Sequence, residues 1–162
     1  MASNPLEIIH DAAWTAAVAD TELATLVKPG NRIKFDERSS TKTQIQDGDL
    51  PELILIPRSG VGNFTQTSSN VGFDITYDWL ISTGDYRVNY RMYPVTWSLF
   101  RAMAAFQVTA PALAYKTRKF VTGISFQNVN IGESDPERNR GIKGFSAVFT
   151  FVIKMSFVKG QL

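Results

Sequence analysis

Residues 144–158 form the stretch GFSAVFTFVIKMSFV, in which apolar side chains recur at almost every second position. Because an extended chain points successive side chains to opposite faces, one face of this stretch carries a row of apolar residues. The row consists of Phe145, Ala147, Phe149, Phe151, Ile153, Met155 and Phe157. Such a strand runs on the order of 40 Å, against a radius of gyration near ~15 Å for a compact chain of this size. The pattern predicts one strand that crosses nearly the whole domain.

Two other segments have the extended character needed to pair with this strand. Residues 71–81 alternate strictly, which places Val71, Phe73, Ile75, Tyr77, Trp79 and Ile81 on a core face. The other face carries Asp74, Thr76 and Asp78 and is expected to meet water or a partner. Residues 120–131 are also extended, and a shift of the apolar phase between Phe126 and Val129 predicts a bulge.

Shorter strands are predicted nearer the N-terminus. Residues 53–56 are a continuous apolar run between Pro51 and Pro57, which predicts a short central strand buried on both faces. Residues 32–35 predict another short strand. Residues 60–70, rich in Gly, Ser, Thr and Asn, predict a flexible connection.

Helices are indicated at the N-terminus and in the middle of the chain. Asn4 is a good N-cap for a helix with Pro5 and Glu7 in its first turn. Its apolar face consists of Leu6, Ile9, Ala13 and Ala17. Asp20 caps a second short turn, and Pro94 stands near the start of the main amphipathic helix. That helix is marked by Val95, Leu99, Ala102, Met103 and Phe106.

These elements predict an α+β fold in one domain spanning residues 1–162. We expect a mixed or antiparallel twisted sheet packed against an amphipathic helix, with an N-terminal helix and extended polar arms at about 36–49 and 132–144. The net charge of +2 does not imply binding to a nucleic-acid backbone. No cysteine is present, so disulfides and thiolate chemistry are excluded. With neither a signal peptide nor an apolar run of membrane-spanning length, we expect a soluble protein made in the cytoplasm.

Catalytic residues are scarce. His10 is the only histidine, and its position in the first helix favours an ordinary helix residue over a catalytic one. The acids Asp36, Glu37, Asp47 and Asp49 make a weak candidate for a divalent metal site, and the sequence from Asp47 to Asp49 is better explained as a turn. Residues 60–62, GVG, lack the other parts of a phosphate-binding motif. We therefore expect no enzyme activity, no metal and no cofactor.

Two further segments carry candidate binding residues. Tyr86, Arg87, Tyr90, Arg91 and Tyr93 interleave aromatic and basic groups, which is typical of single-stranded nucleic-acid binding but is better explained by tyrosines at the boundary of the core. The two polar arms carry charges suited to contacts between protein copies, and a solvated loop remains an equal alternative for the second arm. The interface candidates are Asp36, Glu37, Arg38, Lys42, Asp47, Asp49, Glu133, Asp135, Glu137, Arg138, Arg140 and Lys143.

The order of these features resembles the tail terminator and tail completion proteins of long-tailed bacteriophages. The matching features begin with a leucine-rich turn at 23–27, a strand at 30–35, a polar arm ending at Asp49 and a Leu-Pro step into residues 53–56. The alternating strand 73–82, the helix 99–106 and the closing hairpin from Phe120 onward complete the match, while residues 65–69 and 83–94 depart from it.

The resemblance implies a structural virion protein located in the tail or neck and assembled in the host cytoplasm. It implies a homo-oligomeric ring, a hexamer, that caps the tail tube and ends its polymerisation. Its partners would be further copies of itself, the tail tube protein and the head-tail connector or stopper protein, with the genome passing through the lumen without specific binding. The alternatives are another neck or tail-tube subunit of the same virion, and a single-stranded nucleic-acid-binding module.

Overall fold

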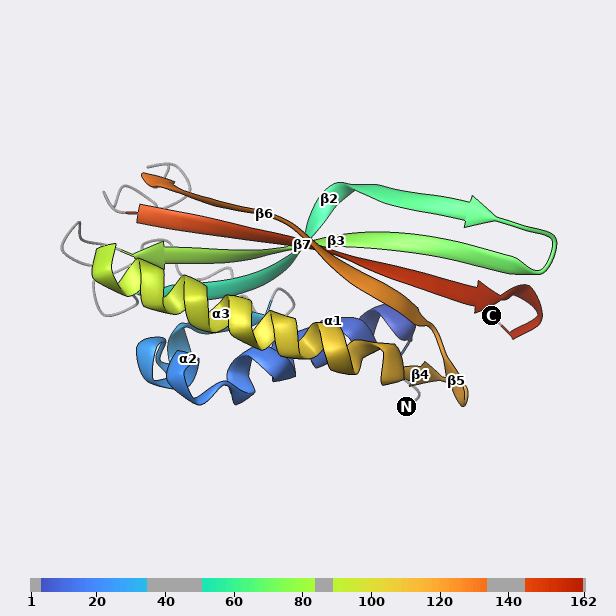
Figure 1. The fold of residues 1–162 in the computed structure, drawn as a ribbon, viewed down its shortest axis with the longest axis horizontal. Coiled ribbons are helices and arrows are strands. Elements are labelled where there is room, and N and C mark those ends of the chain that lie inside the picture. Colours follow the sequence, from blue (N-terminus) through green and yellow to red (C-terminus); the bar gives the residue numbers. More distant parts are fainter. Residues whose placement is uncertain (1–3, 35–50, 84–88, 134–144, 162) are drawn as a thin grey trace.

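A computed structural model of the chain describes residues 4–34, 51–83, 89–133 and 145–161. Within these residues a five-stranded sheet, in the order β1-β2-β3-β7-β6, has three helices packed against one face (Figure 1). The strands are β1 (Arg32–Lys34), β2 (Glu52–Gln66), β3 (Asn70–Thr83), β6 (Val121–Glu133) and β7 (Phe145–Val158). The helices are α1 (Pro5–Ala19), α2 (Thr21–Leu26) and α3 (Asn89–Thr109). A small hairpin pairs β4 (Ala114–Tyr115) with β5 (Arg118–Lys119), and short 3-10 helices occupy Pro29–Asn31, Ala110–Ala112 and Lys159–Gln161.

This arrangement confirms the α+β class. The sheet is mixed, because β1 runs parallel to β2. The other three pairs, β2–β3, β3–β7 and β7–β6, are antiparallel. Figure 1 shows the strong twist of the sheet, with the helices gathered below it. The predicted arms at about 36–49 and 132–144 lie almost entirely outside the described residues, so they stay predictions.

Strand β7 is the long strand that the alternating stretch predicts. It pairs over its whole length with β3, from Asn70 opposite Val158 to Thr83 opposite Phe145. The row from Ala147 to Met155 is buried on the helix side of the sheet. On its other edge β7 pairs with β6, and the register shifts between Phe126 and Asn128, which confirms the predicted bulge.

Strand β2 differs from its prediction in length and position. It continues through residues 60–66, which were predicted to be a flexible connection, and it lies second from the edge rather than in the centre. Its register against β3 shifts between Pro57 and Gly62. Because proline cannot donate a ladder hydrogen bond, a bulge there lets pairing resume beyond it. The connection to β3 is therefore only the short turn at 67–69.

The sheet face away from the helices also differs from its prediction. Thr76 and Asp78 are buried, although their alternation with the core row predicted contact with water or a partner. The Thr150 hydroxyl donates a hydrogen bond of 2.7 Å to Oδ1 of Asp78. Alternation thus identifies which residues share a face, but it does not tell which face is covered.

The N-terminal helices begin as predicted. The side chain of Asn4 accepts a hydrogen bond from the Glu7 amide at 3.0 Å, and Glu7 accepts one from the Asn4 amide at 3.2 Å, forming a capping box. Ile9, Ala13 and Ala17 of α1 are buried against the sheet, as expected. Leu6 was predicted on the same face but is exposed, because it lies in the first turn, where the helix reaches past its packing partners.

The centre of the core lies between α1, α3 and β3. Trp79 is fully buried, stacks on Trp14 with ring centroids 6.0 Å apart, and donates its indole N–H to the sulfur of Met103 at 3.2 Å. The predicted apolar face of α3 is buried from Val95 to Phe106. Pro94 lies inside α3, in its second turn, where it cannot donate the hydrogen bond that a helical residue makes to the carbonyl of Tyr90.

Candidate assembly surface

The predicted interface residues fall almost entirely outside the described structure. Only Glu133 belongs to a described element, as the last residue of β6, and its side chain is not described. The others lie within 35–50 and 134–144. Their proposed contacts therefore stay predictions, and the described residues must be searched for surfaces of their own.

The described residues hold little that resembles a catalytic or metal centre. No group of three or more His, Cys, Asp or Glu side chains lies close enough to bind a metal in this part of the chain. His10 is half-buried in α1, with its ring centroid 5.8 Å from that of Tyr77. Burial raises the pKa of Tyr77 to about 12. No helix within the described ranges combines the length and apolar character that crossing a membrane requires.

Several exposed apolar side chains lie on α3 and on the neighbouring strand β6. Tyr93, Trp97 and Phe100 follow one another at helical spacing along one side of α3, and Tyr93 and Trp97 are 64% and 62% exposed. Val129 and Ile131 of β6 are also exposed. We call these five residues the α3–β6 surface. The prediction that Tyr93 bounds the core is wrong, because its ring faces solvent.

Ring contacts join Trp97 and Phe100 of the α3–β6 surface to the core. Trp97 stacks on Phe100 with centroids 5.7 Å apart, and Phe100 packs against the rings of Phe126 and Phe149 at 5.5 and 6.2 Å. In the sheet Val129 stands opposite Phe149 in the register, so its side chain is on the same face. The exposed aromatic residues of α3 therefore rest on the core and extend it outward to the edge of the sheet.

A second exposed apolar group lies at the opposite end of the sheet. Phe64 is 73% exposed, and its ring lies 4.8 Å from that of Phe73 across the β2–β3 pair. The turn that follows closes with a hydrogen bond of 2.9 Å from the Thr67 amide to the Asn70 carbonyl. Figure 1 shows this turn at the end of the molecule away from the start of α3.

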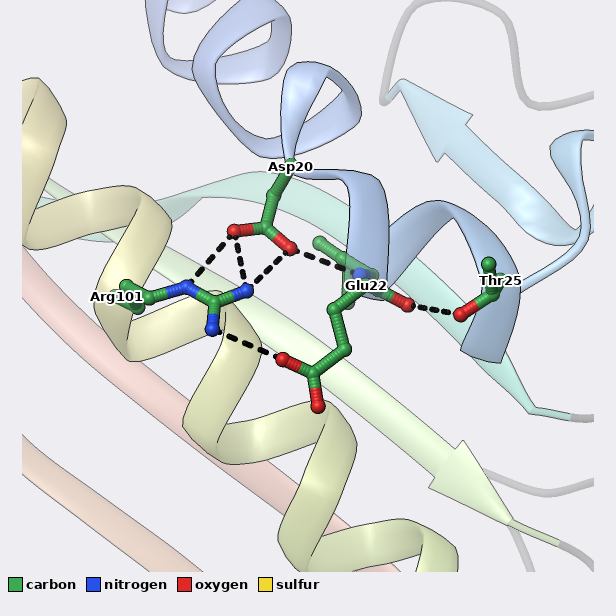
Figure 2. Close-up of polar contacts among 5 residues, drawn as sticks. Asp20, Glu22, Thr25 and Arg101 are labelled. Carbon is green, nitrogen blue, oxygen red and sulfur yellow. Dashed lines mark hydrogen bonds and ion pairs between the residues drawn. The ribbon is translucent and has the colours of Figure 1, made fainter.

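An ionic cluster joins α3 to the N-terminal helices (Figure 2). Arg101 of α3 donates from Nη2 to both carboxylate oxygens of Asp20 at 2.8 and 2.9 Å, and from Nε at 3.1 Å. Its Nη1 lies 2.9 Å from the carboxylate of Glu22. Asp20 also caps α2 by accepting the Leu23 amide at 2.9 Å.

The electrostatics of Asp20 follow from these contacts. Burial by itself would raise the pKa of this carboxyl group. The hydrogen bonds from the Leu23 amide and from Arg101 stabilise its charged form and together hold the pKa below the ordinary value of 3.8. Arg101 directly follows Phe100 on α3. Its ion pairs with Asp20 and Glu22 therefore lie next to the α3–β6 surface along the helix.

The β4–β5 hairpin carries a small basic cluster. Lys116 and Thr117 have φ values of 46° and 68°, a left-handed conformation that costs energy for a β-branched threonine. Lys116, Arg118 and Lys119 are all exposed, and the Lys116 ammonium lies 5.3 Å from the centre of the Tyr115 ring. The hairpin borders a hollow that also includes Phe120 and the end of β7. Neither the hairpin nor its charge cluster was predicted.

A second apolar side of α3, which indicates the α3–β6 surface, can be recognised in the sequence. Tyr93, Trp97, Phe100 and Ala104 recur at the same helical spacing as the buried residues, so α3 has two apolar sides. A surface helix needs only one such side for its own core. The second side is therefore not required for the core that α3 forms with the sheet.

The comparisons with known proteins bear on the fold. No protein-family model and no curated protein matches the chain. Among solved structures, the chain is similar to one from the virion of a native gene transfer agent particle, with a TM-score of 0.54 and 12% sequence identity. The similarity covers 92% of this chain and 95% of that chain. The two chains therefore share a fold over almost their entire lengths.

Proposed function

We propose that this protein is a structural component of a phage-like virion, and more specifically a tail terminator. In that role several copies form a ring that caps the tail tube, ends its polymerisation and joins it to the head connector. The observation that carries the proposal is the fold shared with a virion chain over almost the full length of both proteins.

The exposed surfaces support a role in assembly. Trp and Tyr are enriched at the centres of protein interfaces, and the α3–β6 surface presents one of each. These side chains rest on the rigid core through Phe100. A preformed aromatic surface suits a protein that acts by binding other subunits.

The proposed partners are further copies of the chain, the tail tube protein and the connector or stopper protein. We propose a hexamer, which follows from the family resemblance rather than from the geometry. The charged residues of the polar arms, from Asp36 to Asp49 and from Glu133 to Lys143, would set register between subunits or bind the tube.

Two alternatives compete with this role. Another neck or tail-tube subunit would share the fold and the exposed apolar surface. A nucleic-acid-binding module would use Arg87 and Arg91, as the sequence predicts, although Arg87 and the side chain of Arg91 lie outside what the structure describes. Lys116, Arg118 and Lys119 of the β4–β5 hairpin would add further basic groups. Such binding weakens as salt rises and would be lost on reversing those charges.

Immunogold electron microscopy of purified particles carrying a tag on this chain tests the proposal. Tail termination predicts label confined to the junction between head and tail. Label along the whole tube would identify a tube subunit, and particles without label would contradict a virion role. A tagged tube protein serves as the control for antibody access.

A further inference from the structure

The α3–β6 surface is large enough to form the centre of a subunit interface. From the exposed fractions of its residues and side-chain areas of roughly 150–250 Å² for aromatic residues, it presents on the order of 500 Å² of apolar area. The largest patch on a typical monomer is about 300–600 Å², and a stable interface buries about 800 Å² on each partner. The surface thus supplies more than half of one side of a standard interface.

Strand β6 adds an uncharged sheet edge to this surface. It is the last strand of the sheet, and residues 121–132 contain neither a charged residue nor a proline. Natural edge strands usually carry lysine, proline or bulges that prevent pairing with another chain. The described strand has two bulges but neither of those side chains, so its outer edge is only partly protected and remains open to a protein partner.

The uncharged hairpin tip is the complementary feature on the same chain. Phe64 is exposed, and residues 59–73, which include the whole turn, contain no charged residue. An uncharged aromatic tip can enter an uncharged aromatic surface without leaving any charge buried and unpaired. The tip and the surface are therefore compatible, because both are uncharged.

The two features cannot meet within one molecule. Ile131 stands opposite Ala147 on β7, whereas Phe73, the partner of Phe64, stands opposite Met155. Eight residues of extended strand separate those two positions, which is about 26 Å at 3.3 Å per residue. Phe64 also lies on the far side of β3 from β6. Any contact between tip and surface must join two copies.

We propose that Phe64 of one copy packs on the α3–β6 surface of a second copy, against Trp97. Because tip and surface are different patches, the contact is heterologous. An open assembly then has one free tip at one end and one free surface at the other until it closes. That the assembly closes as a ring, and does not continue as a filament, rests on the proposed function. The contact itself is a property of the isolated chain.

Cross-linking tests the contact directly, since the chain has no cysteine. The double variant Phe64→Cys with Trp97→Cys, treated with a short bis-maleimide, should give a ladder of dimers and higher species on a denaturing gel. The matched control combines Phe64→Cys with Val108→Cys. Val108 is 81% exposed on the same helix but lies about 16 Å farther along it, so the control should stay monomeric.

A mixing experiment distinguishes this contact from a symmetric one. Phe64→Glu keeps the surface and loses the tip, while Trp97→Glu keeps the tip and loses the surface. Each variant alone should be monomeric by analytical ultracentrifugation, and an equimolar mixture should form dimers and nothing larger. If Phe64→Glu alone still assembled through its α3–β6 surface, the contact would be symmetric and the proposal wrong.

The outcomes separate this inference from the proposed function. At about 100 µM an interface with a micromolar Kd is saturated. A wild-type chain that stays monomeric at that concentration would overturn the inference, and the surface would then bind another protein. Label at the head-tail junction without a 64–97 cross-link would overturn the inference alone. A 64–97 ladder from a protein absent from particles would overturn the virion role alone.

Discussion

Arg101 and Asp20 join α3 to the first turn of α2 through two oxygens of one carboxylate, with Nη2 2.8 Å from Oδ2 and 2.9 Å from Oδ1. The same carboxylate caps α2 through the Leu23 amide. Asp20 is nearly buried and Arg101 about half exposed. One side chain therefore both begins a helix and adds an ion pair to the core packing that holds α3 in place.

Substitution at Asp20 should separate its two roles. Asparagine can still accept the Leu23 amide, so Asp20→Asn should lose only the ion pair and cost less than about 1 kcal/mol of unfolding free energy. Asp20→Ala should lose both contacts and cost about 1–2 kcal/mol. Urea unfolding at pH 7 measures both values. Equal losses for the two variants would mean that the cap has no part in stability.

The ion pair should also make stability depend on acid pH. The pKa of Asp20 is lower in the folded chain than its ordinary value of 3.8. Its contribution is therefore present above pH 3.8 and is lost as pH falls through the folded pKa. The difference in unfolding free energy between wild type and Asp20→Asn should shrink over that range. A difference that stays constant down to acid pH would contradict the assignment.

At alkaline pH the relevant group is Tyr77. Burial raises its pKa to about 12, so the folded chain holds this proton more tightly than the unfolded chain. Stability should fall as pH rises above the ordinary value of 10, by an amount on the order of 2 kcal/mol between pH 10 and 12. Tyr77→Phe should remove this part of the decrease. Guanidinium unfolding of both proteins across this range provides the measurement.

The hydrogen bond between Thr150 and Asp78 should matter because both residues are buried. Thr150→Val removes the hydroxyl at nearly constant volume and should cost about 1–3 kcal/mol, the penalty for withdrawing a donor from a buried polar group. Thr150→Ser keeps the hydroxyl and should cost only about 1 kcal/mol for the lost methyl group. If Thr150→Val were as stable as wild type, this hydrogen bond would make no contribution to stability.

The second polar arm gives a prediction about assembly. Reversing Arg138 and Arg140 to glutamate should lower the yield of particles while leaving the purified monomer folded, because opposite charges set register between subunits. Arg118→Glu with Lys119→Glu, on the exposed β4–β5 hairpin, is the matched double reversal elsewhere. Particle counts from complemented hosts decide the matter. If the variant with Arg138 and Arg140 reversed gave an unchanged particle yield, the second polar arm would have no role in assembly.

The sequence predicted those elements whose local pattern agrees with their final environment. The alternation around Phe149 and Trp79 identified β7 and β3, and the phase shift after Phe126 identified the bulge in β6. Capping by Asn4 and Asp20 was equally predictable, because each cap is formed within four residues of the chain. Local chemistry and tertiary packing agree at these positions.

Features that depend on distant parts of the chain escaped prediction. Residues 60–66 lack an apolar period and join β2 only because β3 continues opposite them. Asp78 is polar and buried, and nothing in its own strand indicates that its face is covered. On α3 the burial of Leu99 was predicted, but the second apolar side with Trp97 was not, and only the fold shows that Trp97 is exposed.

Electron microscopy of particles from a genome that lacks this gene tests the central claim most directly. A role in tail termination predicts filled heads beside detached tails of uncontrolled length. Normal particles should be restored when the gene is supplied in trans. Intact infectious virions from the deleted genome would contradict a role in tail termination. Heads without any tails would instead assign the protein to the tube or to tail initiation.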